Sequence, residues 1–343
     1  YVIYGLVNRL SSRILFVEYK ERSRRIVYKF SGVHYPQGRL DYGLSYNGID
    51  KLVLFGGYVD NRCSNDLWLY DFKENRWEML NYSEYKKSVN QQPSQRRKSA
   101  VFLYGDEIYI FGGETDTLIG NTFIPLNDLW VFKISTRLFY RLDRNGELPR
   151  REANIVYVDN NEIHLYVKSG YDDITGQNVP NRIYVFDKGL NRVVRVIDIN
   201  NPPFIPNSKH RTFYNNGQYY VLTYDGKLYR YNKSNNTFTL INTNTNTYYV
   251  GITGDGNYYI NKIIERTHTG RDNRLPTIDL VKFQLIKVSD GKVYKTFDIT
   301  PPPIMHIPHY VLVNDRYVVF THGMLTESDL NEKVFIYDTQ TGD

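Results

Sequence analysis

The sequence predicts an all-β protein built from repeated antiparallel sheets. Tyrosine accounts for 32 of the 343 residues, whereas alanine occurs only at Ala100 and Ala153. The chain is therefore poor in the strongest helix former and rich in a residue that suits a pleated, half-buried surface. Short apolar runs also recur along the chain, separated by glycines and polar turns. We expect very little helix.

Two stretches, residues 51–80 and 107–142, repeat one pattern. Each contains an apolar strand ending in two glycines, a polar loop, a strand that begins with Asn-Asp-Leu-Trp, and a further aromatic strand. Such self-similarity is the signature of a repeat architecture. The corresponding positions are Gly56, Gly57 and Asn65 to Trp68 in the first copy, and Gly112, Gly113 and Asn127 to Trp130 in the second.

Weaker copies follow at residues 162–197, 218–241 and 257–299, where the glycine pair is lost but the strand order is kept. The chain ends, 316–343 and 1–30, carry complementary parts of one more pattern. Third strands recur at intervals of 45 to 62 residues, and their aligned positions are Ile14, Leu67, Leu129, Ile183, Leu228, Leu280 and Val334.

The glycine pair followed by Asn-Asp-Leu-Trp resembles the kelch repeat, which implies a β-propeller of four-stranded antiparallel blades. We predict a single domain over 1–343, with seven blades, and a chain that is a piece of a longer protein. Six blades, with the two end segments merged into one, is the alternative. The predicted blades span residues 1–30, 36–80, 96–142, 149–197, 209–241, 248–299 and 308–343.

The repeated residues have structural interpretations. Gly57 and Gly113 are expected where the backbone turns with positive φ or passes close to a neighbouring blade. An aromatic side chain is expected to fill the space between blades at Trp68, Trp77 and Trp130, and Phe139 replaces the fourth-strand Trp in the second copy.

The sequence offers little for catalysis. The kelch family includes a copper-dependent galactose oxidase, and that resemblance implies a Cys–Tyr cross-link and two histidine ligands. The chain has one cysteine, Cys63, and its closest histidines, His306 and His309, are too few to complete a metal site by themselves. Phosphate loops, nucleophile elbows and calcium loops are missing. We expect no enzyme activity, no cofactor and no metal, and a copper oxidase is the least favoured alternative.

Arginines recur in the segments that precede the first strand of four blades, which we term the leading loops. Guanidinium groups suit carboxylates and phosphates, and some kelch adaptors use such arginines to hold acidic peptides. The alternative is that these arginines tie neighbouring loops together. The predicted binding residues are Arg39, Arg97, Arg151 and Arg211, with Arg96 and Arg150 beside them.

Two proline-rich leading loops, 199–208 and 300–308, carry apolar residues. A stiff loop loses little entropy when it binds a partner, so these residues are candidate anchors. Packing over the edge of the blade is an equally favoured alternative. The candidates are Phe204, Ile205, Ile304 and Met305.

The favoured function is a non-enzymatic recognition propeller within a surface, secreted or virion-associated protein. It is expected to bind a protein or glycan and to join a larger complex. The alternative is an intracellular adaptor that binds an acidic peptide at the arginine-lined mouth. The net charge of +6 favours an acidic partner, but the pattern is not that of a nucleic-acid binder. No apolar run is long enough to span a membrane.

Overall fold

In the computed structural model, the described residues form strands and turns and contain no helix. The structure describes residues 17–18, 27–28, 36, 39, 41–47, 51–59, 62–71, 74, 76–81, 91–116, 123–143, 145–172, 176–223, 225–242, 247–252, 258–267, 278–299, 309–313, 317–321 and 334–338. The chain divides into two compact units. The larger unit comprises Gly32–Leu222 and Tyr229–Thr239, and the smaller unit comprises Tyr1–Ser31, Thr223–Leu228 and Leu240–Asp343.

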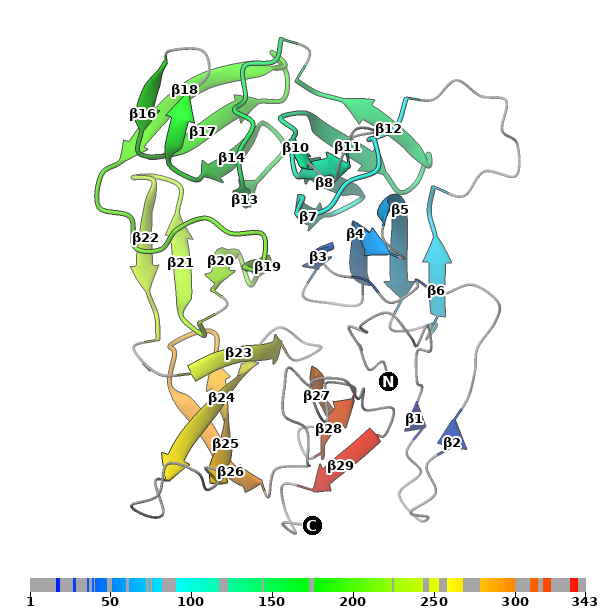
Figure 1. The fold of residues 1–343 in the computed structure, drawn as a ribbon, viewed down its shortest axis with the longest axis vertical. Coiled ribbons are helices and arrows are strands. Elements are labelled where there is room, and N and C mark those ends of the chain that lie inside the picture. Colours follow the sequence, from blue (N-terminus) through cyan, green and yellow to red (C-terminus); the bar gives the residue numbers. More distant parts are fainter. Residues whose placement is uncertain are drawn as a thin grey trace. The chain divides into compact units, whose positions relative to one another are not determined.

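The larger unit holds four antiparallel sheets of four strands each (Figure 1). Only two strand ends of the fourth sheet, Leu228 and Leu240, are assigned to the smaller unit. The first sheet consists of β3 (Gly43–Tyr46), β4 (Lys51–Val59), β5 (Arg62–Asp71) and β6 (Arg76–Met79). The second consists of β7 (Ala100–Tyr104), β8 (Glu107–Phe111), β11 (Leu129–Lys133) and β12 (Leu138–Arg141). The third consists of β13 (Ala153–Val158), β14 (Glu162–Val167), β17 (Asn181–Asp187) and β18 (Arg192–Ile199). The fourth consists of β19 (Arg211–Asn215), β20 (Gln218–Leu222), β21 (Leu228–Asn232) and β22 (Thr237–Leu240).

The first strands of consecutive sheets, β3, β7, β13 and β19, contact one another. Their leading loops therefore meet. The amide of Lys98 donates to the backbone oxygen of Asp41 at 2.6 Å, and the amide of Ser208 donates to the Glu152 carboxylate at 3.0 Å. The leading loops of neighbouring sheets thus lie next to one another in this unit.

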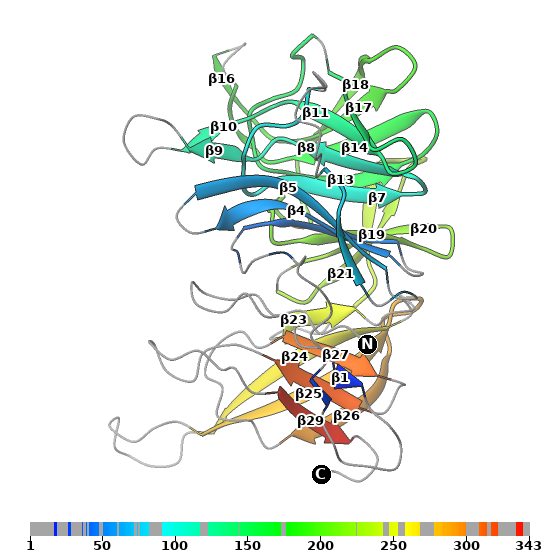
Figure 2. The same ribbon diagram turned by 90° about the vertical axis from the view of Figure 1, so that its right-hand side faces the viewer.

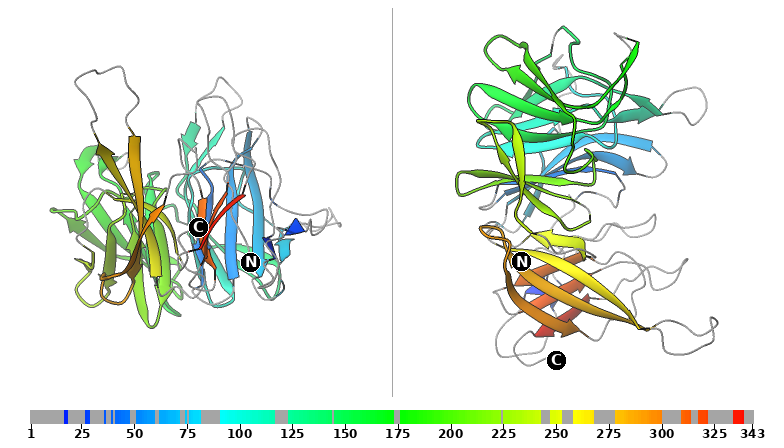
Figure 3. Two further views of the ribbon diagram at one scale, coloured as in Figure 1. Left: turned by 90° about the horizontal axis from the view of Figure 1, so that it is seen from below. Right: turned by 90° about the vertical axis from the view of Figure 1, so that its left-hand side faces the viewer.

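The smaller unit contains one sheet of four strands, one of three and a short pair among the described residues. Its long central hairpin, β24 and β25, lies to the lower right in the right panel of Figure 3. Figure 2 shows β27 among the strands of this unit. The strands are β1 (Val17–Glu18), β2 (Val27–Tyr28), β23 (Thr247–Ile252), β24 (Tyr258–Thr267), β25 (Ile278–Lys287), β26 (Val293–Ile299), β27 (His309–Val313), β28 (Tyr317–Thr321) and β29 (Val334–Asp338).

Short hairpins extend the second and third sheets between their second and third strands. They are formed by β9 (Glu114–Asp116) with β10 (Phe123–Pro125), and by β15 (Gly170–Asp172) with β16 (Gln177–Val179). In the first sheet, β4 and β5 themselves continue past Gly57 as a comparable extension. These extensions lie beside the leading loops, because Arg97 pairs with Glu114 through two backbone hydrogen bonds.

The core lies between neighbouring sheets. Four consecutive residues of β8, from Ile108 to Phe111, are each at most 1% exposed. Successive side chains of a strand point to opposite faces. Accordingly, Tyr109 and Phe111 pack in the cluster shared with the third and fourth sheets, while Ile108 and Ile110 pack in the cluster shared with the first. Burial on both faces explains the nearly continuous apolar runs in the sequence.

The double glycines have the predicted backbone conformation. Gly57 and Gly113 have φ of 102° and 93°. A Cβ at Gly113 would lie 2.5 Å from the backbone oxygen of Arg97 in the leading loop, and one at Gly56 would lie 2.6 Å from that of Arg96. The predicted positive φ is therefore confirmed at both Gly57 and Gly113, and Gly113 also lies close to the leading loop of its own blade.

The repeated aromatic positions also correspond. The rings of Trp68 and Trp77 meet edge to face, with centroids 6.4 Å apart and planes at 88°. Trp130 and Phe139 have the same separation of 6.4 Å and the same angle of 88°. Phe139 thus takes the place of the fourth-strand Trp, as predicted.

The predicted all-β architecture of antiparallel propeller blades is confirmed, and every predicted blade segment contains described strands. Whether seven or six blades close the propeller, and whether 1–343 is one domain, stay predictions. Within the described residues, no helix has the length and apolar character needed to cross a membrane.

Candidate functional site

Arg39 lies in the leading loop of β3, where a binding arginine is expected from the sequence. Its side chain is 3% exposed, and its terminal nitrogens hold both carboxylate oxygens of Asp66, at 2.5 and 2.7 Å. The same guanidinium donates to the backbone oxygen of Gly56 at 2.9 Å. Trp68 Nε1 donates to Asp66 at 2.6 Å. Arg39 is enclosed within its own sheet, so the structure corrects its assignment as a partner-binding residue.

Arg96 repeats this arrangement in the second sheet. Its side chain is 1% exposed and holds both oxygens of Asp128 at 2.5 and 2.7 Å, while Nη1 donates to the backbone oxygen of Gly112 at 3.1 Å. Trp130 Nε1 donates to Asp128 at 2.6 Å. The alternative in which leading-loop arginines tie segments together is therefore the correct one for Arg39 and Arg96. We term each arrangement an Arg–Asp clamp.

The clamps keep their carboxylates ionised. Burial raises the pKa of Asp66, but the hydrogen bonds and charge of Arg39 outweigh burial and hold the pKa below its usual value. The pKa of Asp128 is lowered in the same way, since the contacts of Arg96 outweigh burial. A buried bidentate pair satisfies both groups and fixes their geometry.

Arg97 is half-buried and already neutralised. Its guanidinium contacts Asp41 at 3.1 Å and Glu114 at 2.7 Å. It also lies 3.5 Å from the centroid of the Phe123 ring, a cation–π arrangement. Arg97 therefore joins the leading loop of β3 to the β9–β10 hairpin. Its predicted role in partner binding stays a prediction, although both of its charge partners are internal.

Arg211 lies in the fourth sheet and donates to two backbone oxygens, those of Ser208 at 3.1 Å and His210 at 3.3 Å. Its guanidinium carbon lies 5.8 Å from the centroid of the Tyr42 ring. These contacts hold a leading loop in place. They include no carboxylate partner, so the charge of Arg211 is not cancelled by a described contact.

Arg151 differs from Arg39, Arg97 and Arg211 because it lines a pocket, together with Arg150. The pocket has a volume of about 210 Å³ and lies between the leading loops of β7 and β13 and the base of the β9–β10 hairpin. Gly170 lies beside the guanidinium, since a Cβ there would be at ordinary contact distance, 3.6 Å, from Arg151 Nε. The lining residues are Lys98, Gly113, Glu114, Pro125, Arg150, Arg151, Glu152 and Lys168.

The carboxylates of this pocket are already occupied. Glu114 contacts Lys98 at 2.9 Å in addition to Arg97. Glu152 contacts Lys168 at 3.4 Å and accepts two hydrogen bonds from Ser208, each 3.0 Å long. Burial raises the pKa of Glu152, but the Ser208 hydrogen bonds and the Lys168 ammonium more than offset it, so the pKa is lowered. Both acids are therefore committed to internal partners.

Arg150 and Arg151 carry the remaining charge. Arg150 is exposed and Arg151 half-buried. Within the part of the chain that the structure describes, neither guanidinium has an ion pair or a side-chain hydrogen bond. The pocket thus presents two unpaired guanidinium groups, and it can bind an anion without breaking an existing contact.

The four apolar candidate anchors differ in how exposed they are and in whether the structure describes them. Phe204 is 9% exposed and packs against Tyr166 and Tyr229, with ring centroids 5.3 and 4.9 Å away. It covers the edge of the sheet, so the structure corrects its assignment as an exposed anchor. Ile205 is 47% exposed and remains a candidate. Ile304 and Met305 lie outside the described residues.

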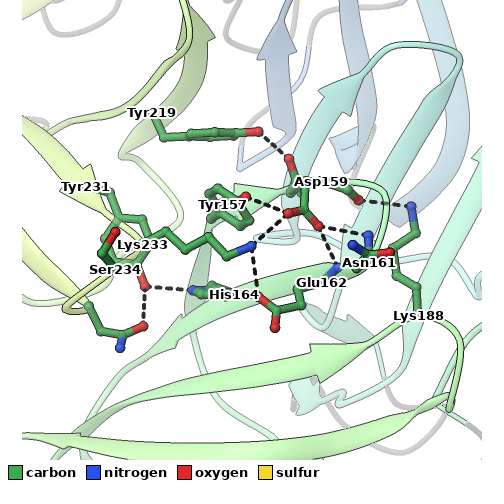
Figure 4. A network of polar contacts seen from close by, with 12 residues as sticks. Tyr157, Asp159, Asn161, Glu162, His164, Lys188, Tyr219, Tyr231, Lys233 and Ser234 are labelled. Carbon is green, nitrogen blue, oxygen red and sulfur yellow. Dashed lines mark hydrogen bonds and ion pairs between the residues drawn. The ribbon is translucent and has the colours of Figure 1, made fainter.

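A polar network lies at the other end of β13, roughly 20 Å from the pocket by strand length (Figure 4). Asp159 accepts hydrogen bonds from Tyr157 Oη at 2.6 Å and Lys233 Nζ at 2.8 Å. Lys233 also contacts Glu162 at 3.2 Å, which connects the third and fourth sheets. Lys188 joins the Asp159 backbone oxygen at 3.2 Å to Glu107 of the second sheet at 3.0 Å.

His164 occupies the buried side of this network. Its Nε2 lies 3.1 Å from the Glu162 carboxylate, and its Nδ1 lies 2.7 Å from Tyr231 Oη. Burial lowers the pKa of His164, so the ring is neutral at neutral pH. A carboxylate only accepts, so Nε2 carries the proton, and Nδ1 shares the single hydroxyl hydrogen of Tyr231 with Asn236 Oδ1, which lies 3.1 Å from that hydroxyl. Each of these polar atoms has an internal partner, which indicates a structural brace between sheets.

The described residues contain no group of three or more His, Cys, Asp and Glu side chains placed to hold a metal. Cys63 is buried, and its Sγ lies 3.9 Å from the backbone oxygen of Glu114. His210 bonds the backbone oxygen of Ile205 at 2.9 Å. His306 is outside the described residues, so the distant copper-oxidase alternative receives no support from the described part.

The sequence did not single out Lys98, Lys168 or Glu152 as pocket residues. Arg150 and Arg151 were visible as a basic pair, but so were Arg96 and Arg97, which are internal. The sequence does contain a signal that distinguishes the arginines that form clamps from those that do not. The Asp of Asn-Asp-Leu-Trp is replaced by Arg182 in Asn181–Tyr184 of the third blade, so a clamp of the same kind cannot form there.

Comparison with known proteins gives a match to the family model of the KLHDC2/KLHL20/DRC7 Kelch-repeats domain over residues 45–258. Tip elongation aberrant protein 1 of Schizosaccharomyces pombe is 35% identical over 102 residues, covering 28% of this chain and 8% of that protein. Human host cell factor 1 is 32% identical over 103 residues, covering 29% and 5%. Kelch repeat-containing protein 2 of Saccharomyces cerevisiae is 31% identical over 90 residues, covering 25% and 10%. The matched part spans a tenth or less of each relative.

Proposed function

The chain belongs to the kelch-repeat family of protein-binding propeller modules, and from that premise we propose that it recognises an acidic segment of a partner protein at the pocket formed by Arg150 and Arg151. The observation that carries this proposal is the unpaired charge of these two guanidinium groups. Every other charged residue of the pocket is neutralised by an internal contact.

The size of the pocket supports a side-chain ligand. Its volume of about 210 Å³ is below the roughly 300–1,000 Å³ of pockets that enclose drug-sized ligands. One or two acidic side chains of a partner fit this space. The two guanidinium groups favour a carboxylate or a phosphate group, because their planar fork matches both.

The surroundings of the pocket provide apolar contact. Pro125 lines the pocket at the end of β10, and the neighbouring Ile124 is 42% exposed. On the second hairpin, Tyr171 is 61% exposed beside Gly170. Exposed apolar and aromatic side chains next to a charged pocket are typical of protein-binding surfaces. The proposed partner segment therefore combines acidic residues with a flanking apolar residue.

Fluorescence anisotropy with a labelled library of extended peptides tests this proposal. The library carries Asp or Glu at alternate positions, and a second library carries Asn or Gln at the same positions. We expect binding only of the acidic library, weakened by added salt because the contacts are electrostatic. Arg150→Glu combined with Arg151→Glu should weaken binding at least tenfold, which corresponds to about 1.4 kcal/mol.

Arg195→Glu is the matched control, since Arg195 is exposed on the outer strand β18 and lies outside the pocket. It reverses one charge of the same kind outside the pocket and should leave peptide affinity unaltered. Equal affinity for the acidic and amide libraries, or equal loss with Arg195→Glu, would exclude recognition at this pocket.

Localisation and ligand class are separate proposals. Display outside the cell or on a virion rests on composition, and a glycan ligand is favoured only by Tyr171, whose exposed ring and hydroxyl suit stacking on a sugar. A glycan array with wild type and Tyr171→Ala tests the proposal of a glycan ligand. Binding of a sugar that Tyr171→Ala abolishes would add a glycan site to the protein site.

A further inference from the structure

Asp143 is a buried carboxylate with one oxygen that lacks a partner. Its side chain is 2% exposed. Oδ1 accepts a hydrogen bond from the Leu129 amide at 2.6 Å and lies 3.5 Å from Arg141 Nε. Oδ2 is buried as well, but no described residue donates a hydrogen bond to it. Burying an unpaired carboxylate oxygen is costly, so the ionised form of Asp143 does not suit this position.

The first sheet has an asparagine at the corresponding position. Asn81 Oδ1 accepts a hydrogen bond from the Leu67 amide at 2.8 Å. Leu67 and Leu129 occupy the same place in the repeated Asn-Asp-Leu-Trp, and Asn81 therefore corresponds to Asp143. The other polar atom of Asn81, Nδ2, donates to the backbone oxygen of Asn65 at 2.8 Å. The carboxamide thus uses both of its polar atoms, whereas the carboxylate uses one.

The fourth sheet also has an asparagine here. In the second and fourth sheets, the residue before this position donates its amide to the first residue of the third strand, at 2.8 Å in each. Asn242 is therefore the counterpart of Asp143 in the fourth sheet, and it is 2% exposed. Two of these three sheets have a carboxamide at this buried position, and only the second has a carboxylate.

The repeat also identifies the partner that Asp143 Oδ2 lacks. Asn127 corresponds to Asn65, and no described hydrogen bond reaches the backbone oxygen of Asn127. An ionised carboxylate only accepts, so it cannot bond this oxygen, whereas a protonated carboxyl group donates one hydrogen bond. Protonated Asp143 can therefore make the contact to Asn127 that Asn81 makes to Asn65.

Asn127 ties the start of β11 to the leading loop of β13. Its Nδ2 donates to the backbone oxygen of Leu148 at 2.8 Å, and Asn65 makes the same contact to Pro93 at 2.9 Å. Leu148 is 1% exposed and precedes Arg151 by three residues. Asn127 therefore fixes the base of the loop that places Arg151 in the pocket.

We infer that Asp143 is a proton-dependent positioning residue for the pocket of Arg150 and Arg151. When protonated, its Oδ2 donates to the backbone oxygen of Asn127 and holds the leading loop of β13 in place. When ionised, it loses this hydrogen bond, and the loop is held less firmly. The effect on peptide binding rests on the proposed function, whereas the contact with Asn127 does not.

The charges around Asp143 place this change in a mildly acidic range. Burial raises the pKa of Asp143 to about 6, against the opposing effects of the Leu129 amide and the Arg141 guanidinium. The charge of Asp128 adds to burial, although Arg96 holds that carboxylate. Carboxyl groups of a peptide titrate near pH 4, at about 3.9 for Asp and 4.3 for Glu. An acidic peptide therefore keeps its charge while Asp143 takes up a proton.

Hydrogen exchange followed by mass spectrometry tests the contact without a peptide. After correction for the intrinsic pH dependence of exchange, residues 145–152 of wild type should be about fivefold better protected at pH 5.5 than at pH 7.5, which corresponds to about 1 kcal/mol for one hydrogen bond. Asp143→Asn should be protected at both pH values, because its amide donates as that of Asn81 does. Asn81→Asp should create the same pH dependence in the leading loop of β7, at residues 91–98.

Asp198→Asn is the matched control, since Asp198 is 48% exposed on β18 and contacts Arg182 of its own sheet. It removes one carboxylate elsewhere and should keep the wild-type pH dependence of exchange at residues 145–152. Equal protection of wild type at the two pH values, or an unchanged pH dependence in Asp143→Asn, would overturn the inference.

Fluorescence anisotropy with an acidic peptide at the same two pH values tests the effect on the pocket. Wild type should bind more tightly at pH 5.5, by up to about fivefold, and Asp143→Asn should bind equally tightly at both. Peptide affinity of wild type that does not change with pH would overturn the positioning role. Proton-dependent protection of the loop without any peptide binding would support the contact and count against the proposed function alone.

Discussion

Arg96 holds Asp128 through both terminal guanidinium nitrogens, at 2.5 and 2.7 Å, with its side chain 1% exposed. The contact joins residues 32 positions apart in the chain. It fastens the leading loop of β7 to the start of β11, next to the double glycine. Because the first sheet has the same contact, the clamp is a repeated element of this fold and not a property of one loop.

Arg96→Ala should destabilise the larger unit by about 3–5 kcal/mol, because it leaves the Asp128 carboxylate buried without its cation. Urea denaturation followed by tryptophan fluorescence measures the loss. Asp128→Asn with Arg96→Ala should cost less than the sum of the single changes. Arg150→Ala is the control, because its guanidinium has no described side-chain partner, and it should change stability by less than about 0.5 kcal/mol. Equal effects of Arg96→Ala and Arg150→Ala would contradict the clamp.

Gly113→Ala should be far more damaging than Gly105→Ala. Both glycines have positive φ, 93° and 58°, so both substitutions introduce backbone strain of about 1–2 kcal/mol. Only Gly113 is also crowded, since a Cβ there would lie 2.5 Å from the Arg97 backbone oxygen, whereas nothing lies within 4 Å of one at Gly105. The difference in Tm between the two variants, measured by thermal denaturation, gives the destabilisation caused by crowding at Gly113. A similar fall in Tm for both would show that the leading loop moves aside easily.

Asp143 should make the protein more stable as pH falls from 7 to 4. Burial raises the pKa of Asp143 to about 6, above its usual value of 3.8. The folded state therefore binds a proton more readily than the unfolded state between these values, and the free energy of unfolding gains on the order of 2 kcal/mol as pH falls through this window. His164, whose pKa burial lowers, has the opposite effect near its usual value of 6.5.

Urea denaturation of wild type and Asp143→Asn at a series of pH values isolates the Asp143 contribution, because His164 is present in both. The difference in the free energy of unfolding between the two proteins should change across this window and level off below it.

The Arg–Asp clamps are tested by the same series of measurements at lower pH. Because the pKa values of Asp66 and Asp128 are lowered, their stabilisation is present above their usual 3.8 and is lost as pH falls further.

Cys63 should react slowly with thiol reagents in the folded protein. Burial, followed by the charge of Asp116, raises the pKa of its thiol to about 11, so very little thiolate exists at pH 8. Reaction with a chromogenic disulfide should accelerate strongly in urea. Asp116→Asn should speed the native reaction modestly, because it removes one cause of the raised pKa. A native rate equal to the unfolded rate would show that the thiol is not enclosed.

Much of the fold was predictable because its signals are local. The Asn-Asp-Leu-Trp strands and double glycines repeat in the sequence, and the structure gives them matching conformations, as the equal geometries of Trp68 with Trp77 and Trp130 with Phe139 show. Apolar runs such as Ile108 to Phe111 indicated strands buried on both faces. The sequence indicated only polar loops after the double glycines, and the strand pairing of these extensions depends on contacts with the leading loops.

The sequence drew attention to the leading loops but not to which of their residues line the pocket. The leading-loop arginines stand out in the sequence as a group, yet the role of each depends on whether a carboxylate lies within reach. Arg39 and Arg96 meet Asp66 and Asp128, whereas Arg150 and Arg151 meet none among the described residues. For Phe204, contact with a partner and packing over the edge of the blade were equally favoured. Only its packing against neighbouring aromatic rings in the tertiary structure decided for burial.

The sequence by itself determined the repeating unit, because strand length, glycine conformation and aromatic position are properties of residues close together in the chain. Tertiary structure alone decided which charges cancel. An ion pair such as that of Arg96 with Asp128 requires segments far apart in sequence to converge, and its partner cannot be inferred from spacing along one strand. The unpaired charge of Arg150 and Arg151 is what remains after those long-range pairs have formed.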